Sequence, residues 1–286
     1  MTHRFRAGLG TAVALLLAVG CRGPFTGNSG RSLCEGTMTV TSKVEAEVVE
    51  FHAHNACSLP QWLSFEILRP VNLDVDRTGS RSRVIPPGST RSLATARRKD
   101  SSKRHISYSL RYSFWAGDPD ARPDRSVAYA VPFGGSQSCR LGQGPHGVFS
   151  HRQKFAYDFG IPEGTPVLAA RDGVIYSVRD GFSKGSNDPR MARRANVVVV
   201  YHSDATFASY AHLRPGMPVR IGQEVRTGQL LGYSGSTGFS DGPHLHFEVW
   251  TRSRDGGRST LPVRFRNGKR IVEATGDMLF EPQRSH

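Results

Sequence analysis

The chain has 286 residues, of which 37% are hydrophobic and 22% charged. This composition is typical of a globular protein and excludes a fibrous or largely disordered chain, and the length allows two modest domains and a targeting segment. Lys and Arg number 38 against 24 Asp and Glu, a formal net charge of +14, which favours polyanionic surroundings. The basic residues are scattered and are not interleaved with aromatic ones, so we do not predict nucleic-acid binding.

The start of the chain resembles an export signal. Two arginines precede an apolar run at residues 12–19 that is too short to span a bilayer as a mature helix. The run leads to Cys21 in the sequence LAVGC, which resembles a bacterial lipoprotein cleavage site, although Ala18 stands where Leu is more usual. Residues 1–20 are therefore predicted to be a lipoprotein signal peptide, with ordinary secretion as the alternative. A lipid on Cys21 would hold the protein at a membrane, and we expect the periplasmic face of an outer membrane.

Three cysteines remain if Cys21 carries a lipid, and they would lie in an oxidising compartment. Cys34, Cys57 and Cys139 cannot all pair within one chain. A Cys34–Cys57 bond would close a loop inside the first domain, whereas a bond to Cys139 would join that domain to the linker, and the spacing leaves both open. None belongs to a C-x-x-C pair, so a cysteine zinc site is not expected.

The segment after the signal divides into a tether and a first domain. Residues 21–33 are rich in Gly, Ser and Arg without periodicity, which is typical of a flexible tether. Residues 106–114 alternate apolar and polar side chains, the pattern of a half-buried strand, and residues 44–55 form a second, less regular strand. Turn-rich connections separate them, so residues 34–140 are predicted to form a small β-sandwich of unknown role.

The remaining residues, 141–286, follow a Gly- and Pro-containing boundary near residue 140 and again favour strands. Four short apolar runs are predicted to pair as two hairpins, 166–170 with 173–178 and 196–201 with 206–210. The polar and basic residues 182–195 are predicted to form an exposed loop that borders a substrate groove. The whole chain is therefore predicted to be all-β, with antiparallel sheets in the second domain and a C-terminal extension.

The most informative motif is His244-Leu245-His246. In a strand, residues two apart point to the same side, so the two imidazoles share one face while Leu245 packs on the other. Such a pair suits a metal ligand and a base. An H-x-H motif alone is weak, because His52-Ala53-His54 has the same form in another strand-like run and lacks an accompanying carboxylate motif. We interpret that second pair as structural or surface residues.

Further motifs accompany His244 and His246 in a fixed order. The matching text is His151, Tyr157-Asp158-Phe159, Pro162 to Val167, Tyr210 to Leu213, Gly228-Gln229, Gly235 to Gly238 and His244 to Glu248. Because it contains these motifs in this order, the segment from His151 to Trp250 resembles the lysostaphin-type, LytM-like family of zinc endopeptidases. The resemblance covers roughly the C-terminal third to two-fifths of the chain.

The resemblance implies a role for each of five residues. His151, Asp158 and His246 would hold one Zn²⁺, and His212 and His244 would be unligated catalytic imidazoles. Three protein ligands leave a fourth position for water, whose pKa zinc can bring down to ~7. His244 would accept the proton of the attacking water, while His212 would stabilise the oxyanion or protonate the leaving amine; the assignment of the two steps stays open.

Some positions have two interpretations. Six residues separate His151 from Asp158, whereas many family members place the first His three residues before a Gly-x-Asp, so His146 is the competing first ligand. Glu248 is either an acceptor that orients a ligand imidazole or an exposed strand residue. We interpret His202, at the end of a predicted strand, as a turn or surface residue.

The resemblance and the predicted export together predict a zinc metalloendopeptidase that hydrolyses peptide bonds of peptidoglycan. The alternative is a catalytically silent, wall-binding regulator of other murein hydrolases on the same fold. Such relatives lose metal ligands, and this chain has a complete set. A third class, a biotinyl-type carrier, is indicated only by short apolar segments at residues 217–231, which lack a well-placed Lys. A D-amino-acid cross-link, a Gly-Gly bridge or another peptide bond would fit the same zinc chemistry.

Overall fold

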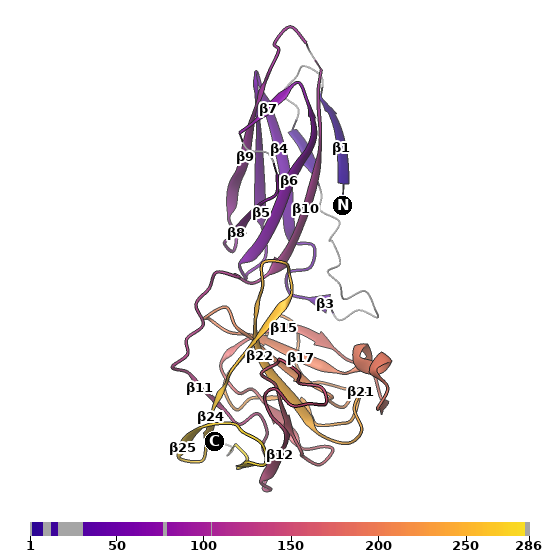
Figure 1. Ribbon diagram of the computed structural model, residues 1–286, viewed down its shortest axis with the longest axis vertical. Helices are drawn as coiled ribbons and strands as arrows, with labels where there is room; N and C mark the ends of the chain where they lie inside the picture. Colours follow the sequence, from indigo (N-terminus) through magenta and orange to yellow (C-terminus); the bar gives the residue numbers. More distant parts are fainter. Residues whose placement is uncertain (1, 8–12, 17–30, 77–78, 104, 284–286) are drawn as a thin grey trace. The chain divides into compact units, whose positions relative to one another are not determined.

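The computed structural model (Figure 1) describes residues 2–7, 13–16, 31–76, 79–103 and 105–283. Cys21 and most of the predicted tether lie outside these residues. The chain divides by its contacts into two compact units, one consisting mainly of Cys34–Pro119 and the other mainly of Asp120–Ser253 and Gly257–His286. Both units are built from strands, so the all-β prediction is confirmed. In the described part of the chain, no helix has the length and apolar character needed to cross a membrane.

The first unit contains two antiparallel sheets. One sheet has the order β1 (Thr2–Ala7), β10 (Ile106–Ala116), β6 (Gln61–Val71) and β8 (Arg81–Ile85). The other has the order β2 (Val13–Leu16), β4 (Met38–Glu45), β5 (Val48–Asn55), β9 (Thr90–Arg98) and β7 (Leu73–Val75). Phe51 from the second sheet and Leu63 and Leu110 from the first are buried in one shared core, as expected when alternate residues of two sheets face each other. The predicted β-sandwich is confirmed.

The prediction of a single strand at residues 44–55 is wrong, because the end of β4 and the whole of β5 occupy this range. β4 and β5 form a tight hairpin in which Glu45 pairs with Val48, and Ala46 has a left-handed φ of 47° that reverses the chain. Hairpin turns require such positive φ values, which are usually supplied by Gly or Asn. Because Ala46 carries no turn signal, the alternating pattern conceals the reversal.

β1 and β2 lie within the segment predicted to be a signal peptide. Each occupies the edge of its sheet, where β1 pairs with β10 and β2 with β4. An edge strand has one neighbour only, so its removal leaves the pairing between the remaining strands intact. The arrangement is therefore compatible with cleavage before Cys21, which stays a prediction.

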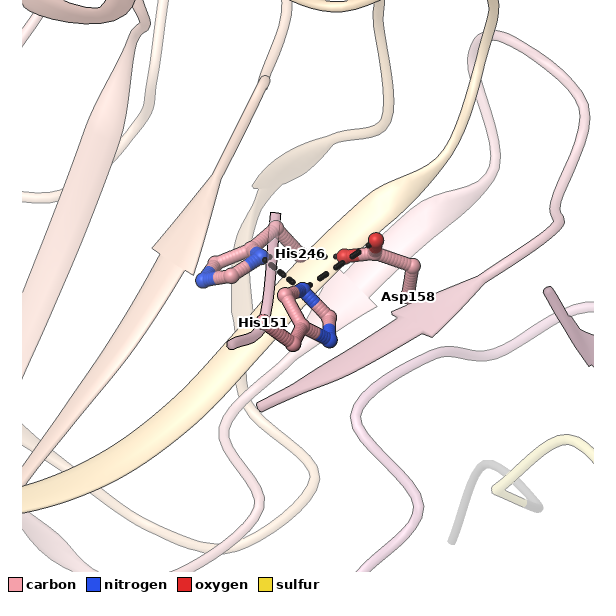
Figure 2. Close-up of side chains that lie close together, drawn as sticks. All are labelled: His151, Asp158 and His246. Atoms are coloured by element: carbon pink, nitrogen blue, oxygen red, sulfur yellow. Dashed lines mark hydrogen bonds and ion pairs between the residues drawn. The ribbon is translucent and has the colours of Figure 1, made fainter. Parts of the chain in front are cut away.

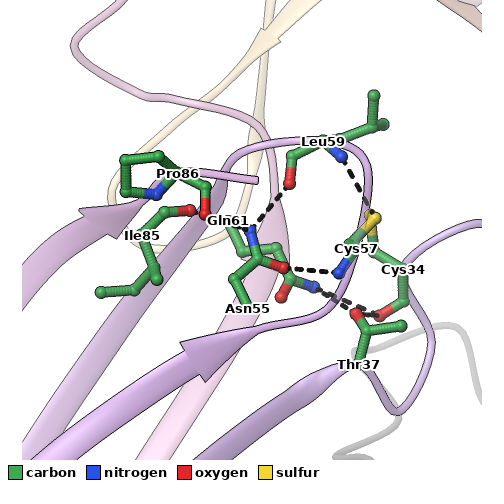
Figure 3. The surroundings of a disulfide bond; sticks show 8 residues. All are labelled: Cys34, Thr37, Asn55, Cys57, Leu59, Gln61, Ile85 and Pro86. Atoms are coloured by element: carbon green, nitrogen blue, oxygen red, sulfur yellow. Dashed lines mark hydrogen bonds between the residues drawn. A yellow bond between two sulfur atoms is a disulfide. The ribbon is translucent and has the colours of Figure 1, made fainter. Parts of the chain in front are cut away.

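A disulfide joins Cys34 to Cys57 (Figure 3). Cys139 is free and buried. The buried Asn55 fixes the loop next to the disulfide. Its side-chain amide donates to three main-chain carbonyls, those of Leu59, Ile85 and Pro86, and its Oδ1 accepts from the main-chain N–H of Cys57 at 2.9 Å. Of the two pairings that the sequence leaves open, the bond within the first domain is therefore the one that forms.

We expect removal of this disulfide to destabilise the first unit. The two cysteines are separated by 23 positions, and a crosslink that closes a loop of this size is worth about 3 kcal/mol through its restriction of the unfolded chain. The double variant Cys34→Ser/Cys57→Ser should lose about that much unfolding free energy in denaturant titrations. Reduction of the wild type should reproduce the loss, and reductant should leave the variant unchanged. A variant within about 0.5 kcal/mol of the wild type would contradict this expectation.

The second unit is built on a ten-stranded sheet. Its main path has the order β19 (Glu224–Val225), β15 (Gly173–Arg179), β17 (Val197–Tyr201), β18 (Phe207–Ala211), β22 (Leu245–Arg252), β13 (Tyr157–Phe159), β12 (Cys139–Gln143) and β26 (Leu279–Phe280). Off this path, β23 (Arg258–Leu261) pairs with β22 and β3 (Arg31–Ser32) pairs with β15. Every pairing in this sheet is antiparallel, as predicted.

Three smaller sheets complete the unit. They are β11 (Ala128–Ala130) with β24 (Arg264–Asn267) and β25 (Arg270–Glu273), β14 (Pro166–Leu168) with β20 (Leu230–Tyr233), and β16 (Gly185–Ser186) with β21 (Gly238–Phe239). β11 pairs with β24 from the C-terminal extension, so residues 120–140, predicted as part of the first domain, lie in the second unit. The contact division falls at Pro119 and Asp120 instead of near residue 140.

One of the two predicted hairpins is present. β17 and β18 pair across a tight turn as predicted, but residues 166–170 and 173–178 do not pair with each other. β14 pairs with β20 and β15 with β17, because the connecting residues cross from one sheet to the other and Ala169 donates to the carbonyl of Gln229. The segment 182–195 is largely exposed as predicted, and it contains β16 and a short 3-10 helix, η1 (Pro189–Arg194).

Candidate metal centre

Three of the predicted site residues converge on one small volume (Figure 2). Asp158 lies at the centre of β13 and pairs directly with His246 on β22, and His151 reaches the same point from the loop before β13. Asp158 Oδ1 lies 2.9 Å from His246 Nδ1, Asp158 Oδ2 lies 3.2 Å from His151 Nε2, and the two ring nitrogens are 3.3 Å apart. One ligand atom from each residue lies within 4.8 Å of the others, a spacing that can hold a metal ion.

Each imidazole of this cluster has a second polar partner behind it. The Nδ1 of His151, a residue only 1% exposed, donates to the carbonyl of Gly144 at 3.0 Å, which leaves Nε2 for the cluster. The Nε2 of His246 lies 3.7 Å from the Glu248 carboxylate, which also contacts Arg258 at 3.4 Å. The Glu248 side chain is 13% exposed, so the alternative of an exposed strand residue is wrong. Such outer partners fix the orientation of metal-binding imidazoles.

The electrostatics of the cluster favour a cation at its centre. Burial disfavours a charge on Asp158, but hydrogen bonds from His151 and His246 outweigh burial and hold the pKa of Asp158 well below its usual range. Burial likewise opposes a charge on His246, yet Asp158 and Glu248 together raise the pKa of His246 to about 10. The carboxylate is therefore ionised at neutral pH and requires a positive partner, which is a proton on His246 or a bound metal ion.

The other two predicted imidazoles lie beside the cluster. The ring centroids of His212 and His244 are 4.5 Å apart, and the His212 centroid is 5.9 Å from that of His246. The Nδ1 of His212 lies 2.7 Å from the carbonyl of Thr237, and that of His244 lies 2.9 Å from the carbonyl of Gly242. A carbonyl can only accept, so Nδ1 carries the hydrogen in both rings, and the neutral form of each presents an unprotonated Nε2.

The neutral form is strongly favoured for His212. Burial lowers the pKa of His212 to about 3, and the neighbouring imidazoles of His244 and His246 act in the same direction. At any pH near 7 the ring is therefore an acceptor at Nε2. This state differs from that of His246, whose carboxylate partners favour the charged ring.

A network that the sequence analysis missed positions His212. His212 itself has a left-handed φ of 64° directly after β18. The buried Thr237 donates from Oγ1 to the carbonyl of Leu213 at 2.9 Å and accepts from the main-chain N–H of Asn196 at 3.0 Å. A Cβ on Gly235 would lie 2.9 Å from Arg214 N, so the backbone at Gly235 can pack against the backbone at Arg214 only because Gly235 has no side chain. The glycines signalled a tight turn, but no sequence signal distinguished Thr237 from the neighbouring serines.

The competing histidines lie elsewhere. His146 has a left-handed φ of 59°, its ring packs edge-on against Phe155 at 4.6 Å, and it is not part of the metal-binding group. The interpretation of His202 as a turn or surface residue is wrong, because the residue is fully buried. Its Nδ1 donates to the carbonyl of Asp172 at 2.7 Å. His52 is partly buried and His54 is exposed on β5, consistent with a structural or surface role.

A half-buried carboxylate between two imidazoles, beside two further imidazoles, is an arrangement suited to metal-assisted hydrolysis. Comparison with known proteins leads to the same class. Residues 152–259 match Peptidase family M23, and the matched range begins directly after His151. The chain therefore carries a domain of the M23 peptidase family.

Similar proteins include two peptidases from other bacteria. Peptidoglycan DD-endopeptidase ShyA of Vibrio cholerae is 40% identical over 97 residues, which are 34% of this chain and 20% of ShyA. DD-carboxypeptidase/endopeptidase Mpg of Neisseria meningitidis is 38% identical over 106 residues, which are 37% of this chain and 21% of Mpg. The chain thus matches about a fifth of the length of these relatives. The lysostaphin catalytic domain of Staphylococcus simulans is 28% identical, covers 44% of this chain and 88% of that domain, and has a TM-score of 0.32.

We expect the buried His202 to make the second unit less stable in mild acid. Burial lowers the pKa of His202 from 6.5 to about 4, so between these pH values the unfolded chain binds a proton that the folded chain does not. The unfolding free energy should therefore fall as the pH drops from 6.5 to about 4, by on the order of 3 kcal/mol from this group, and level off below. Denaturant titrations in the presence of a chelator measure this slope. His202→Asn keeps a donor for the Asp172 carbonyl and should show a shallower slope; equal slopes would refute the assignment.

Proposed function

We propose that this chain is a zinc-dependent endopeptidase that hydrolyses peptide bonds of bacterial peptidoglycan. One observation carries the proposal. His151, Asp158 and His246 bring three ligand atoms within 4.8 Å of one another, beside the rings of His212 and His244. Similarity to ShyA, which is named a peptidoglycan DD-endopeptidase, supports the substrate class, and similarity to Mpg, which is named a DD-carboxypeptidase/endopeptidase, supports peptide hydrolysis.

The donor set fits zinc. Catalytic zinc sites take three protein ligands drawn from His and carboxylate side chains and keep a fourth position open. His151 would bind through Nε2, because its Nδ1 donates to the Gly144 carbonyl, and His246 would bind through the Nδ1 that faces Asp158. When bound, zinc would polarise the scissile carbonyl and lower the pKa of water, so that hydroxide is available as the nucleophile near neutral pH. A serine or cysteine nucleophile is then unnecessary.

The two remaining imidazoles would move the protons. The unprotonated Nε2 of each ring can accept the proton of the attacking water. His212 carries its hydrogen on Nδ1, directed at the Thr237 carbonyl, so it cannot donate to an oxyanion until it has itself been protonated. This leaves His244 as the proposed base at the start of the reaction, because the lowered pKa of His212 makes that ring a weak proton acceptor. The ring that has taken the proton would then deliver it to the leaving amine.

We also propose export and lipid attachment at Cys21. The apolar run at residues 12–19 before that cysteine supports export. The Cys34–Cys57 disulfide supports the same compartment, because disulfides persist in oxidising environments. Anchoring at the periplasmic face of an outer membrane would keep the peptidase domain beside its substrate.

Zinc analysis and digestion of isolated peptidoglycan test the proposal together. The wild type should hold about one zinc per chain and release new amine termini, and His246→Ala should lose both properties because it removes a ligand. His54→Ala is the matched control, since it changes the last histidine of the other H-x-H motif, and it should retain both. A wild type without zinc that releases no amine termini would refute the proposed function.

His244→Ala should separate metal binding from catalysis. The substitution removes a proton acceptor and no proposed ligand, so zinc content should be unchanged while the rate of hydrolysis falls by roughly 10²- to 10⁴-fold. Elemental analysis and the amine-release assay on the same preparation provide both values. Loss of zinc in this variant would overturn the division between ligands and bases.

A further inference from the structure

Gln143 makes four side-chain hydrogen bonds next to the metal-binding cluster. It is the last residue of β12 and pairs with Asp158 on β13, after an irregularity in the ladder between Leu141 and Gln143. Its Nε2 donates to Asp158 Oδ2 at 3.1 Å and to Ser150 Oγ at 2.8 Å. Its Oε1 accepts from the main-chain N–H groups of Phe149 at 3.1 Å and Ser150 at 3.3 Å. One amide group therefore contacts both a proposed metal ligand and the loop that leads to His151.

The orientation of this amide is fixed by its partners. The oxygen faces two N–H donors, and the nitrogen faces a carboxylate and a hydroxyl group. The reversed amide would set its oxygen against the Asp158 carboxylate and its NH₂ group against two donors. Gln143 thus donates to Asp158 Oδ2, while Asp158 Oδ1 faces His246. Rotation of the carboxylate would break the bond from Gln143.

The loop held by Gln143 carries exposed apolar side chains at the site. Val148 is 81% exposed and Phe149 is 60% exposed, an unusual exposure for such large apolar groups. The Phe149 ring stacks on Phe239 of β21 with centroids 5.7 Å apart. The residue after Phe239 is Ser240, whose Oγ lies 3.3 Å from His244 Nδ1. The loop thus extends from the ligand Asp158 to the side of the site that holds the catalytic imidazoles.

We propose that Gln143 is a positioning residue that fixes the Asp158 carboxylate for metal binding and, through the same amide, holds the Phe149 loop against the site as a substrate-contacting wall. The inference rests on the proposed function, because it assumes a metal at the cluster and a substrate beside it. Hydrogen bonds to ligating carboxylates orient them and commonly change metal affinity by 10- to 100-fold. A peptide bound against Phe149 would therefore contact a loop that the Gln143 side chain connects to the proposed metal ligand Asp158.

Gly147 offers an independent way to disturb this amide. A Cβ on Gly147 would lie 2.4 Å from Gln143 Cγ and 2.7 Å from its Oε1. Alanine at this position must therefore displace the Gln143 side chain, although it adds no charge and removes no polar group. Gly276 is a matched control in the same unit, because a Cβ there would meet no atom within 4 Å.

The test measures zinc affinity of the full chain by competition with a chromophoric chelator. Gln143→Met keeps the side-chain length and removes the amide, and it should weaken zinc binding by roughly 10- to 100-fold. Gly147→Ala should weaken it in the same direction by a smaller factor. Gln137→Met, at an exposed position, and Gly276→Ala should bind zinc as the wild type does. Thermal unfolding of each variant shows whether it is folded. If Gln143→Met is not folded, the zinc affinity of Gly147→Ala tests the positioning role.

Kinetics on peptidoglycan peptides separate the two functions of the amide. Phe149→Ala leaves the bond from Gln143 to Asp158 in place, so it should raise KM without changing zinc affinity, whereas Gln143→Met should lower kcat and raise KM. If the wild type binds zinc and both Gln143→Met and Gly147→Ala bind it within about twofold, the positioning role is wrong while the proposed function stands. A wild type that binds no zinc would overturn both.

Discussion

Three residue pairs join β13 to β22, and the middle pair places Asp158 opposite His246. Directly opposed residues in an antiparallel pair have side chains on the same face about 5 Å apart, so the carboxylate and the imidazole meet without any adjustment of the backbone. The flanking pairs bury Tyr157, Phe159, Leu245 and Phe247 on the other face. A shift of β13 by one residue would exchange its two faces, exposing Tyr157 and Phe159 and moving Asp158 to the side of the apolar core. The apolar core therefore determines the geometry of the candidate metal centre.

The site contains four imidazoles whose different states follow from their second partners. His246 lies between two carboxylates, which raise its pKa to about 10 and favour a positive charge at that position. His212 and His244 instead donate from Nδ1 to main-chain carbonyls. A carbonyl fixes the tautomer but adds no full negative charge, and burial lowers the pKa of His212 to about 3. The fold thus separates the imidazole held between carboxylates from the two imidazoles held against main-chain carbonyls.

Much of this site was predictable, because the motif residues are local in sequence and strand geometry is regular. The spacing of His244 and His246 fixed a shared face, and resemblance supplied Asp158 and His212. The parts that were missed depend on pairing between distant segments. The burial of His202 and Glu248 and the pairing of β14 with β20 follow from which strands become neighbours. A local pattern does not encode that choice, since both β14 and β15 have strand-like sequences that would also suit a hairpin.

The choice between His151 and His146 illustrates the same limit in physical terms. Both precede Asp158 in a Gly- and Pro-containing loop, and spacing alone ranks neither. The loop conformation decides, because the Gly144 carbonyl accepts from His151 Nδ1 and so directs its Nε2 toward the carboxylate, while His146 turns away with a left-handed φ and packs on Phe155. The loop in turn depends on Gln143, whose amide binds its main-chain N–H groups. A residue with no titratable group, directly preceding Gly144, thus helps to select which histidine can serve as the first ligand.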